Sequence, residues 1–96
     1  MLKYAILAHL VAKPGKEAQA EEFLKWAVPF VQAEELTVNW YGFRTGASSF
    51  AIFDTFETEE GRNAHLNGAA AERLAAISEE IFDRVAFEMA DIVAVK

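Results

Sequence analysis

The sequence contains no cysteine, only two prolines and two histidines, and few basic residues. Without cysteine, neither a disulfide framework nor a thiolate metal site can form. Nine lysine and arginine residues stand against fifteen aspartate and glutamate residues, and the resulting net charge of −6 argues against nucleic acid or an anionic membrane surface as a partner. No apolar run approaches the roughly 20 residues of a membrane span. We therefore expect neither nucleic acid nor a membrane among the partners.

Apolar residues, by contrast, are in excess. They make up 53% of the 96 residues, which is above the ordinary range for a soluble domain. A chain of this length predicts a single domain, residues 1–96, with a thin core. We expect the surplus apolar area to be buried against a second copy of the chain. Nothing after Met1 resembles a secretory signal with a small-residue cleavage site, so the expected location is the cytoplasm.

The first half of the chain predicts a strand, a helix and a hairpin. Residues 4–13 are almost continuously apolar, and the proline-glycine turn that follows favours a strand covered on both faces over a helix. Residues 15–33 carry apolar side chains at three- and four-residue spacing, as in an amphipathic helix, and Pro29 is expected to kink it or end it early. Residues 37–44 and 49–56 are typical of strands, and the short turn between them makes them antiparallel neighbours.

The second half predicts two helices and a closing strand. Thr58 is a natural N-cap for a helix over residues 59–67, because its hydroxyl can accept a free N–H of the first turn. A glycine then stops this helix, and the alanine-rich residues 69–82 predict another. Residues 84–96 alternate as a strand does and are expected to complete the sheet.

This order, β-α-β-β-α(α)-β, predicts an α+β ferredoxin-like fold with a four-stranded antiparallel sheet and helices on one face. The other face is left bare, and alternation assigns to it the apolar residues Leu7, Val11, Ala51 and Phe53. Water is a poor partner for such a face. Two copies packed sheet to sheet would close it as a dimeric α+β barrel, so we expect a homodimer.

Chemistry in this fold is expected near His65. If the helix over residues 59–67 covers the strand face that bears Phe56, these two side chains face one cleft. An unperturbed histidine titrates near neutral pH, so His65 is the candidate catalytic base; the alternative is a structural histidine with satisfied hydrogen bonds. His9 lies in a run that is expected to be buried, which favours a structural role.

Further side chains can contribute to the cleft. Asp54 lies on the strand face of Phe56, where an unpaired carboxylate would be costly, so we expect it either to orient His65 or to pair with Arg44. Arg44 can hold a substrate oxygen or form a rim salt bridge. Aromatic side chains can line a pocket for an aromatic substrate or simply form core, and Tyr41 and Phe30 belong with them. The candidate substrate-binding residues are Phe56, Trp40, Asp54, Trp26 and Arg44.

Three segments carry a resemblance to a known family. They are AKPGKEAQAEEFLKWAVPFVQAE (Ala12–Glu34), FAIFDTFETEEGRNAHLNG (Phe50–Gly68) and the apolar closing strand. In these segments the chain resembles the antibiotic biosynthesis monooxygenase family of dimeric α+β barrels. The resemblance implies a monooxygenase without flavin or metal, which oxidises a quinol, an anthrone or a similar small aromatic with O2 once the substrate has lost a proton.

Single positions in this comparison refine what it implies. His65 matches the family's helix histidine, and Trp40 stands where relatives often have tyrosine. Phe56 falls where many members, including haem-degrading ones, have tryptophan. Ala8 falls where haem-degrading members have an asparagine on the first strand. Glu35-Leu36 replaces the usual proline-glycine after the first helix. The departures at Phe56 and Ala8 disfavour haem degradation.

Three functions follow for comparison with the structure. The first is the monooxygenase, with His65 as base, an aromatic pocket, no cofactor and no metal site. The second is a small-molecule binding or sensing dimer on the same fold, without chemistry. The third is a haem-handling protein with His65 as axial ligand, which Phe56 and Ala8 disfavour.

Overall fold

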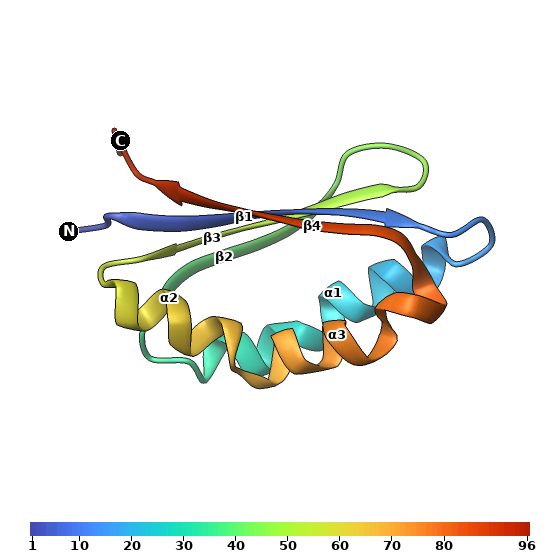
Figure 1. The fold of residues 1–96 in the computed structure, drawn as a ribbon, viewed down its shortest axis with the longest axis horizontal. Coiled ribbons are helices and arrows are strands. Elements are labelled where there is room, and N and C mark those ends of the chain that lie inside the picture. The colour runs from blue at the N-terminus through green and yellow to red at the C-terminus, as the bar shows by residue number, and fades with distance from the viewer.

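The computed structural model describes residues 1–96 and contains a four-stranded antiparallel sheet with three helices on one side (Figure 1). In chain order the elements are β1 (Tyr4–Ala12), α1 (Glu17–Gln32), β2 (Thr37–Arg44), β3 (Ser49–Phe56), α2 (Glu59–Leu66), α3 (Ala69–Ile81) and β4 (Phe82–Asp91). The strands lie in the order β2-β3-β1-β4. This arrangement confirms the predicted α+β ferredoxin-like fold. None of the three helices combines the length and the apolar character needed to cross a bilayer.

The last strand differs from its predicted bounds. β4 begins at Phe82, immediately after α3 ends, and it stops at Asp91 instead of continuing to Lys96. Asp91 pairs with Tyr4, which is the first residue of β1, so no neighbouring strand extends far enough to support a longer β4. No strand of this chain pairs with the alternating residues beyond Asp91.

The first helix also departs from expectation, because it continues through Pro29 to Gln32. The predicted early end is wrong. A proline so close to the end of a helix removes one hydrogen-bond donor and leaves few later turns to disturb. The Pro29 carbonyl still accepts a hydrogen bond from the N–H of Ala33 at 3.3 Å.

The main core lies between the sheet and helices α1 and α3. Side chains alternate along the two central strands, so Ala8 and its register partner Ile52 both face the helices and are both buried. The cluster consists of Ala8, Leu10, Ala12, Ala20, Phe23, Leu24, Phe50, Ile52, Leu74, Ile81 and Phe82. No member comes from α2, whose buried residues are Gly61 and His65. Helix α2 therefore packs on the sheet outside the main core cluster.

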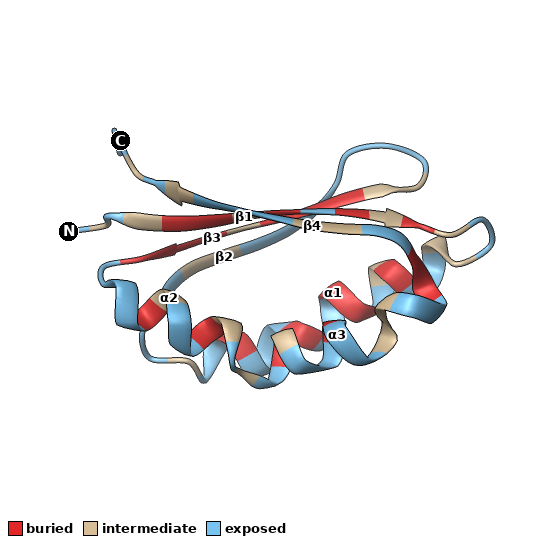
Figure 2. Ribbon diagram, in the orientation of Figure 1, coloured by how far each residue is buried: buried red, intermediate tan, exposed pale blue.

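The opposite face of the sheet has no helix over it (Figure 2). The strand register places Leu7, Val11 and Phe53 on this face, as predicted. Tyr41 and Phe43 of β2 share it and are 57% and 42% exposed. We call this surface the bare face. It presents apolar and aromatic side chains to solvent in the monomer.

His9 also lies on the bare face, and the prediction that it is buried is wrong. Its register partner on β3 is Ala51, and its Nε2 lies 3.0 Å from a carboxylate oxygen of Glu88, with both side chains exposed. The helices cover β1 on one face only. The sequence predicts that both faces of β1 are covered, but no layer of this chain covers its second face.

Candidate active site

Helix α2 presents His65 to the sheet. Its N-terminus is capped as predicted, because the Thr58 hydroxyl accepts a hydrogen bond from the N–H of Gly61 at 3.0 Å. Two glutamates occupy the first turn, where the helix dipole favours negative charge. The ring of His65 lies 5.6 Å from that of Phe56 between centroids. The two side chains are thus neighbours, as the sequence predicts, although Phe56 is fully buried and lines no open space.

His65 is held between two carboxylates from different elements. Its Nδ1 lies 2.6 Å from Oε1 of Glu34, in the loop after α1, and its Nε2 lies 3.0 Å from Oδ2 of Asp54 on β3. Asp54 is 2% exposed and His65 8%. The same Glu34 oxygen accepts a hydrogen bond from the hydroxyl of Thr37 at 2.8 Å. We call these three residues the Glu34–His65–Asp54 triad. Of the two partners predicted for Asp54, the structure has His65 and not Arg44.

The two carboxylates decide the charge of the imidazole. Burial opposes the protonated form and by itself would lower the pKa of His65. Hydrogen bonds and Coulombic attraction from Asp54 and Glu34 outweigh burial, so the pKa of His65 is raised above its ordinary value of 6.5. A protonated imidazole has one N–H donor on each side, which matches one carboxylate acceptor on each side.

Two carboxylate oxygens of the triad have no hydrogen-bond partner, namely Oε2 of Glu34 and Oδ1 of Asp54, and both are buried. The Glu34 oxygen lies against Gly68, where a Cβ would come within 2.6 Å of it, so no ligand fits between them. The Asp54 side chain instead lines an open hollow. An unpartnered buried acceptor is costly. Asp54 is therefore the member of the triad placed to accept a hydrogen bond from a ligand.

We call this space the inner hollow, and its volume is about 30 Å³, enough for about one water molecule. Its only polar lining side chains are Asp54 and His65. The apolar lining residues are Ile6, Ala8, Phe23, Trp40, Ile52, Leu66, Ala70, Ala71, Leu74 and Phe87. A mostly apolar lining with a few convergent polar groups is typical of a small-molecule site.

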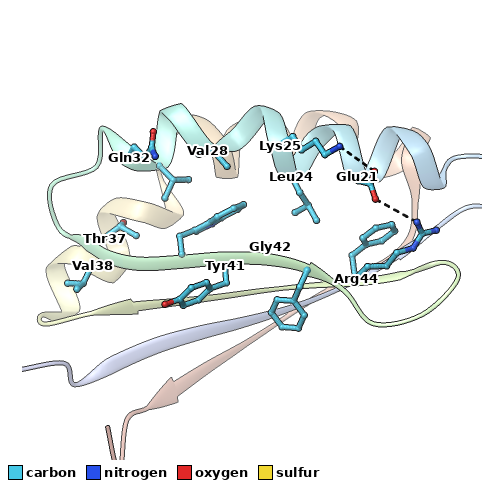
Figure 3. A pocket seen from close by; sticks show the side chains of 14 residues that line it. Glu21, Leu24, Lys25, Val28, Gln32, Thr37, Val38, Tyr41, Gly42 and Arg44 are labelled. Atoms are coloured by element: carbon cyan, nitrogen blue, oxygen red, sulfur yellow. Dashed lines mark ion pairs between the residues drawn. The ribbon is translucent and has the colours of Figure 1, made fainter. Parts of the chain in front are cut away.

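A larger space, the outer groove, lies between α1 and the edge strand β2 (Figure 3). Its volume is about 630 Å³. Leu24 points from α1 towards β2 in Figure 3. The groove is lined by Glu21, Leu24, Lys25, Val28, Val31, Gln32, Thr37, Val38, Trp40, Tyr41, Gly42, Phe43, Arg44 and Phe50. Trp40 is the one residue that lines both this groove and the inner hollow.

Arg44, at one end of the outer groove, is engaged by its own surroundings. Its Nε and Nη2 donate hydrogen bonds to the carbonyl oxygens of Gly46 and Ala47 at 3.0 and 2.6 Å. Its Nη1 lies 3.7 Å from Glu21, and the guanidinium lies 5.1 Å from the ring centroid of Phe50. These contacts hold the β2–β3 turn against α1. They match the rim salt bridge that the sequence allowed. Each guanidinium nitrogen already has a partner, so Arg44 is not free to bind a substrate oxygen.

Trp26 lies outside both spaces. Its side chain is 41% exposed and packs against Phe30 at 4.4 Å between centroids, with Arg73 of α3 5.9 Å from its ring. Helical spacing placed Trp26 on the widened apolar stripe, but the rotation of α1 turns it outwards. Four of the predicted site residues are brought together, namely His65, Asp54, Phe56 and Trp40.

Glu34 is the member of the site that sequence reasoning missed. It lies just beyond the end of α1, and no pattern in the sequence assigns it a role in the site. Its contact with His65 joins positions 31 residues apart, which no local pattern encodes. The one available signal is Thr37, three residues on, whose hydroxyl bonds to the same carboxylate.

Comparisons with known proteins agree with this fold. No protein-family model and no curated protein matches the chain. Among solved structures, the NE2512 protein of unknown function from Nitrosomonas europaea is 39% identical, covers 100% of this chain and 94% of its own, and gives a TM-score of 0.97. A Chloroflexus aurantiacus protein provisionally named an antibiotic biosynthesis monooxygenase is 12% identical over 98% and 96% of the two chains, with a TM-score of 0.76. A Nitrosomonas europaea protein with the same provisional name is 10% identical over 97% and 90%, with a TM-score of 0.81.

Proposed function

The chain belongs to the family of the NE2512 protein of Nitrosomonas europaea and shares its fold with proteins provisionally named antibiotic biosynthesis monooxygenases, and from this we propose that it is itself a monooxygenase. The proposed substrate is a small hydroxylated or acidic aromatic, such as a quinol or an anthrone, and the oxidant is O2. The proposed reaction uses no organic cofactor and no metal, and the proposed compartment is the cytoplasm. The protein binds the aromatic, accepts its proton and excludes water.

The observation that carries the proposal is the unpartnered, buried Oδ1 of Asp54, a residue that lines the inner hollow together with His65 and apolar side chains. A general base must reach the proton it abstracts within hydrogen-bond distance, and this oxygen has no other partner. His65 has both ring nitrogens engaged, so it has no free position for a substrate proton. We therefore assign the proton-accepting role to Asp54 in place of His65. His65 and Glu34 become positioning residues that hold Asp54 and balance its charge.

For an anthrone the proposed reaction balances without an external reductant. Asp54 takes a proton from the ring CH2, the resulting anion reduces O2, and a carbon–oxygen bond forms at that carbon. Asp54 returns its proton to the peroxide, and loss of water leaves a carbonyl. In sum, CH2 and O2 become C=O and H2O, so one oxygen atom enters the product and the other enters water.

Oxygen uptake with a panel of quinols and anthrones tests this function. The wild type is expected to exceed the uncatalysed rate, and Asp54→Asn is expected to lose about 100-fold or more, as removal of a general base does. His9→Gln is the matched control, because His9 lies on the bare face, and it should keep full activity. Circular dichroism confirms that each variant is folded. A wild type that consumes no oxygen with any panel member, or an Asp54→Asn variant with unchanged uptake, would contradict the proposal.

Binding without chemistry is the second candidate, and the geometry of His65 favours it over haem handling. Axial ligation of haem needs one free ring nitrogen, and here both are occupied by carboxylates. A binding protein would show calorimetric binding of the panel compounds with no oxygen uptake. A Soret band that appears with haemin and disappears in His65→Ala would instead support the haem protein.

We also propose that two copies of the chain pack through the bare face. That face exposes Tyr41 and Phe43, and Leu7, Val11 and Phe53 are only partly covered. An apolar face of this kind is expected to be buried when a self-complementary partner is available. The proposed homodimer leaves the inner hollow on the helix side of each sheet.

A further inference from the structure

Neither the inner hollow nor the outer groove is a complete ligand site alone. The hollow, at about 30 Å³, is lined by Asp54, whose Oδ1 is unpartnered, but it has no room for an aromatic ring. The groove, at about 630 Å³, falls in the range of roughly 300–1,000 Å³ typical of ligand pockets. Its charged side chains satisfy one another, since Glu21 pairs with both Lys25 and Arg44 (Figure 3). Space for the aromatic ring of a ligand and the carboxylate that could accept its hydrogen bond therefore lie in separate compartments in this structure.

Trp40 is the partition between the two compartments. It is the register partner of Asp54 on the neighbouring strand, so the two side chains lie next to each other on the helix face of the sheet. The indole rests against Gly42, where a Cβ would come within 3.1 Å of the ring and within 3.2 Å of Leu24. Glycine at this position lets the ring lie flat beside the strand. Because β2 is an edge strand, no further strand confines the ring from that side.

We propose that the Trp40 indole is a movable partition, and that its displacement joins the outer groove and the inner hollow into one ligand site. The ligand is a planar aromatic whose ring lies in the groove against the apolar side chains of α1, and whose hydroxyl or N–H donates to Oδ1 of Asp54. A molecule of the same shape without a donor leaves that oxygen unpartnered and binds more weakly. The inference rests on the proposed function in taking Asp54 as the group that meets the ligand, but it concerns binding and entry and not turnover.

The alternative to entry past Trp40 is entry at the opposite edge of the sheet. Phe87 of β4 lines the hollow and is 49% exposed. Entry past Phe87 would leave Trp40 and the outer groove without a part in binding. The observations favour the Trp40 route, because the space of ligand size lies on that side.

Binding is measured with 2-naphthol and with 2-methoxynaphthalene, which has the same rings but no donor. Calorimetry under anaerobic conditions is expected to show that 2-naphthol binds at least about tenfold more tightly, since the ether leaves a buried carboxylate oxygen unsatisfied. This comparison uses the unaltered protein, so it does not depend on a variant that folds. Equal binding of both compounds, or binding of neither, would overturn the inference.

Movement of the partition is measured on the indole N–H resonances of the protein labelled with nitrogen-15. The chain has two tryptophans, and Trp26 lies outside both compartments, so its resonance is an internal control. On addition of 2-naphthol the Trp40 resonance should shift and that of Trp26 should not. In Gly42→Ala, the added methyl group should displace the free-state Trp40 resonance in the direction that the ligand does. A Trp40 resonance that stays fixed when 2-naphthol binds would overturn the inference.

Rates of association separate the two routes. Trp40→Ala removes the partition and is expected to speed the association of 2-naphthol by about tenfold, whereas Phe87→Ala should leave it unchanged. The reverse pattern would overturn the inference and assign entry to the β4 edge. Oxygen uptake remains a separate readout. Donor-dependent binding with a shifted Trp40 but no uptake would end the monooxygenase proposal alone, and uptake without any response of Trp40 would end this inference alone.

Discussion

His65 illustrates how neighbouring charges redirect the role of a residue. From the sequence it is the natural base, because its ordinary pKa is near neutral. In the structure each ring nitrogen faces a carboxylate, and these two neighbours raise the pKa of His65 above its ordinary value. Oε2 of Glu34 and Oδ1 of Asp54 have no hydrogen-bond partner, and of these two residues only Asp54 lines the inner hollow. We therefore propose that Asp54 meets the substrate proton and that His65 positions it.

Stability is expected to fall as pH rises through the folded-state pKa of His65. The folded pKa is raised above 6.5, whereas the unfolded chain titrates near 6.5, so the folded state binds the proton more tightly. The stabilisation is therefore fully present below the unfolded pKa and is lost above the folded one. Thermal unfolding of the wild type between about pH 6 and about pH 9 should show a falling midpoint that His65→Gln lacks.

His9→Gln is the control for this experiment, since His9 is the only other histidine and lies on the opposite face of the sheet from the triad. It should keep the pH dependence of the wild type. If the His65→Gln midpoint falls as steeply as that of the wild type, the charge of the triad does not stabilise the fold.

At the scale of elements, local signals set most of the boundaries. β2 and β3 have the predicted bounds, because β-branched and aromatic runs flank a short polar turn. α2 begins after the predicted cap residue Thr58. The failures have a non-local cause. The end of β4 depends on where β1 begins, and the outward turn of Trp26 depends on how α1 rotates against the sheet.

Removal of the α2 cap is expected to loosen the site more than the core. Thr58→Ala loses the hydrogen bond from the N–H of Gly61 and should cost about 1 kcal/mol of unfolding free energy. Because α2 contributes nothing to the main core cluster, amide exchange should accelerate in α2 and change least in the central strands. Denaturant unfolding and hydrogen exchange measure the two effects. Thr58→Ser keeps the hydroxyl and should behave as the wild type, and uniform acceleration across the sheet would contradict this division.

At the scale of the whole molecule, the bare face is the surface through which we propose that two copies of the chain pack. Phe53 lies on this face between β1 and β2 partners that are themselves apolar, namely Leu7 and Tyr41. Phe53→Asp would place an unpaired charge in the proposed intersubunit core. Sedimentation velocity should show a wild-type dimer and a dissociated or unfolded variant. Phe53→Leu keeps the apolar surface and should stay dimeric. A folded wild-type monomer at micromolar concentration would contradict the homodimer.

The fold could be predicted almost completely and the site only in part, for one physical reason. Alternation along β3 and capping of α2 are local, and together they place Phe56, Asp54 and His65 on the same side of the sheet. Contacts between distant segments are not local. Glu34 reaches His65 only because the loop after α1 passes the C-terminal end of α2, and sequence spacing carries no trace of that approach.

The junction between α3 and β4 has a consequence for how the length of this chain can vary. Ile81 ends the helix and Phe82 begins the strand, so no linker absorbs a change in length. A single residue inserted there would invert the two sides of β4, turning Glu88 towards the helices and Phe87 away from the hollow. The turn between β2 and β3 is exposed over residues 45–47 and bears no site residue, so the direction of the strands does not depend on its length in this way. Natural length variation in this family is therefore expected at the hairpin and not at the helix–strand joint.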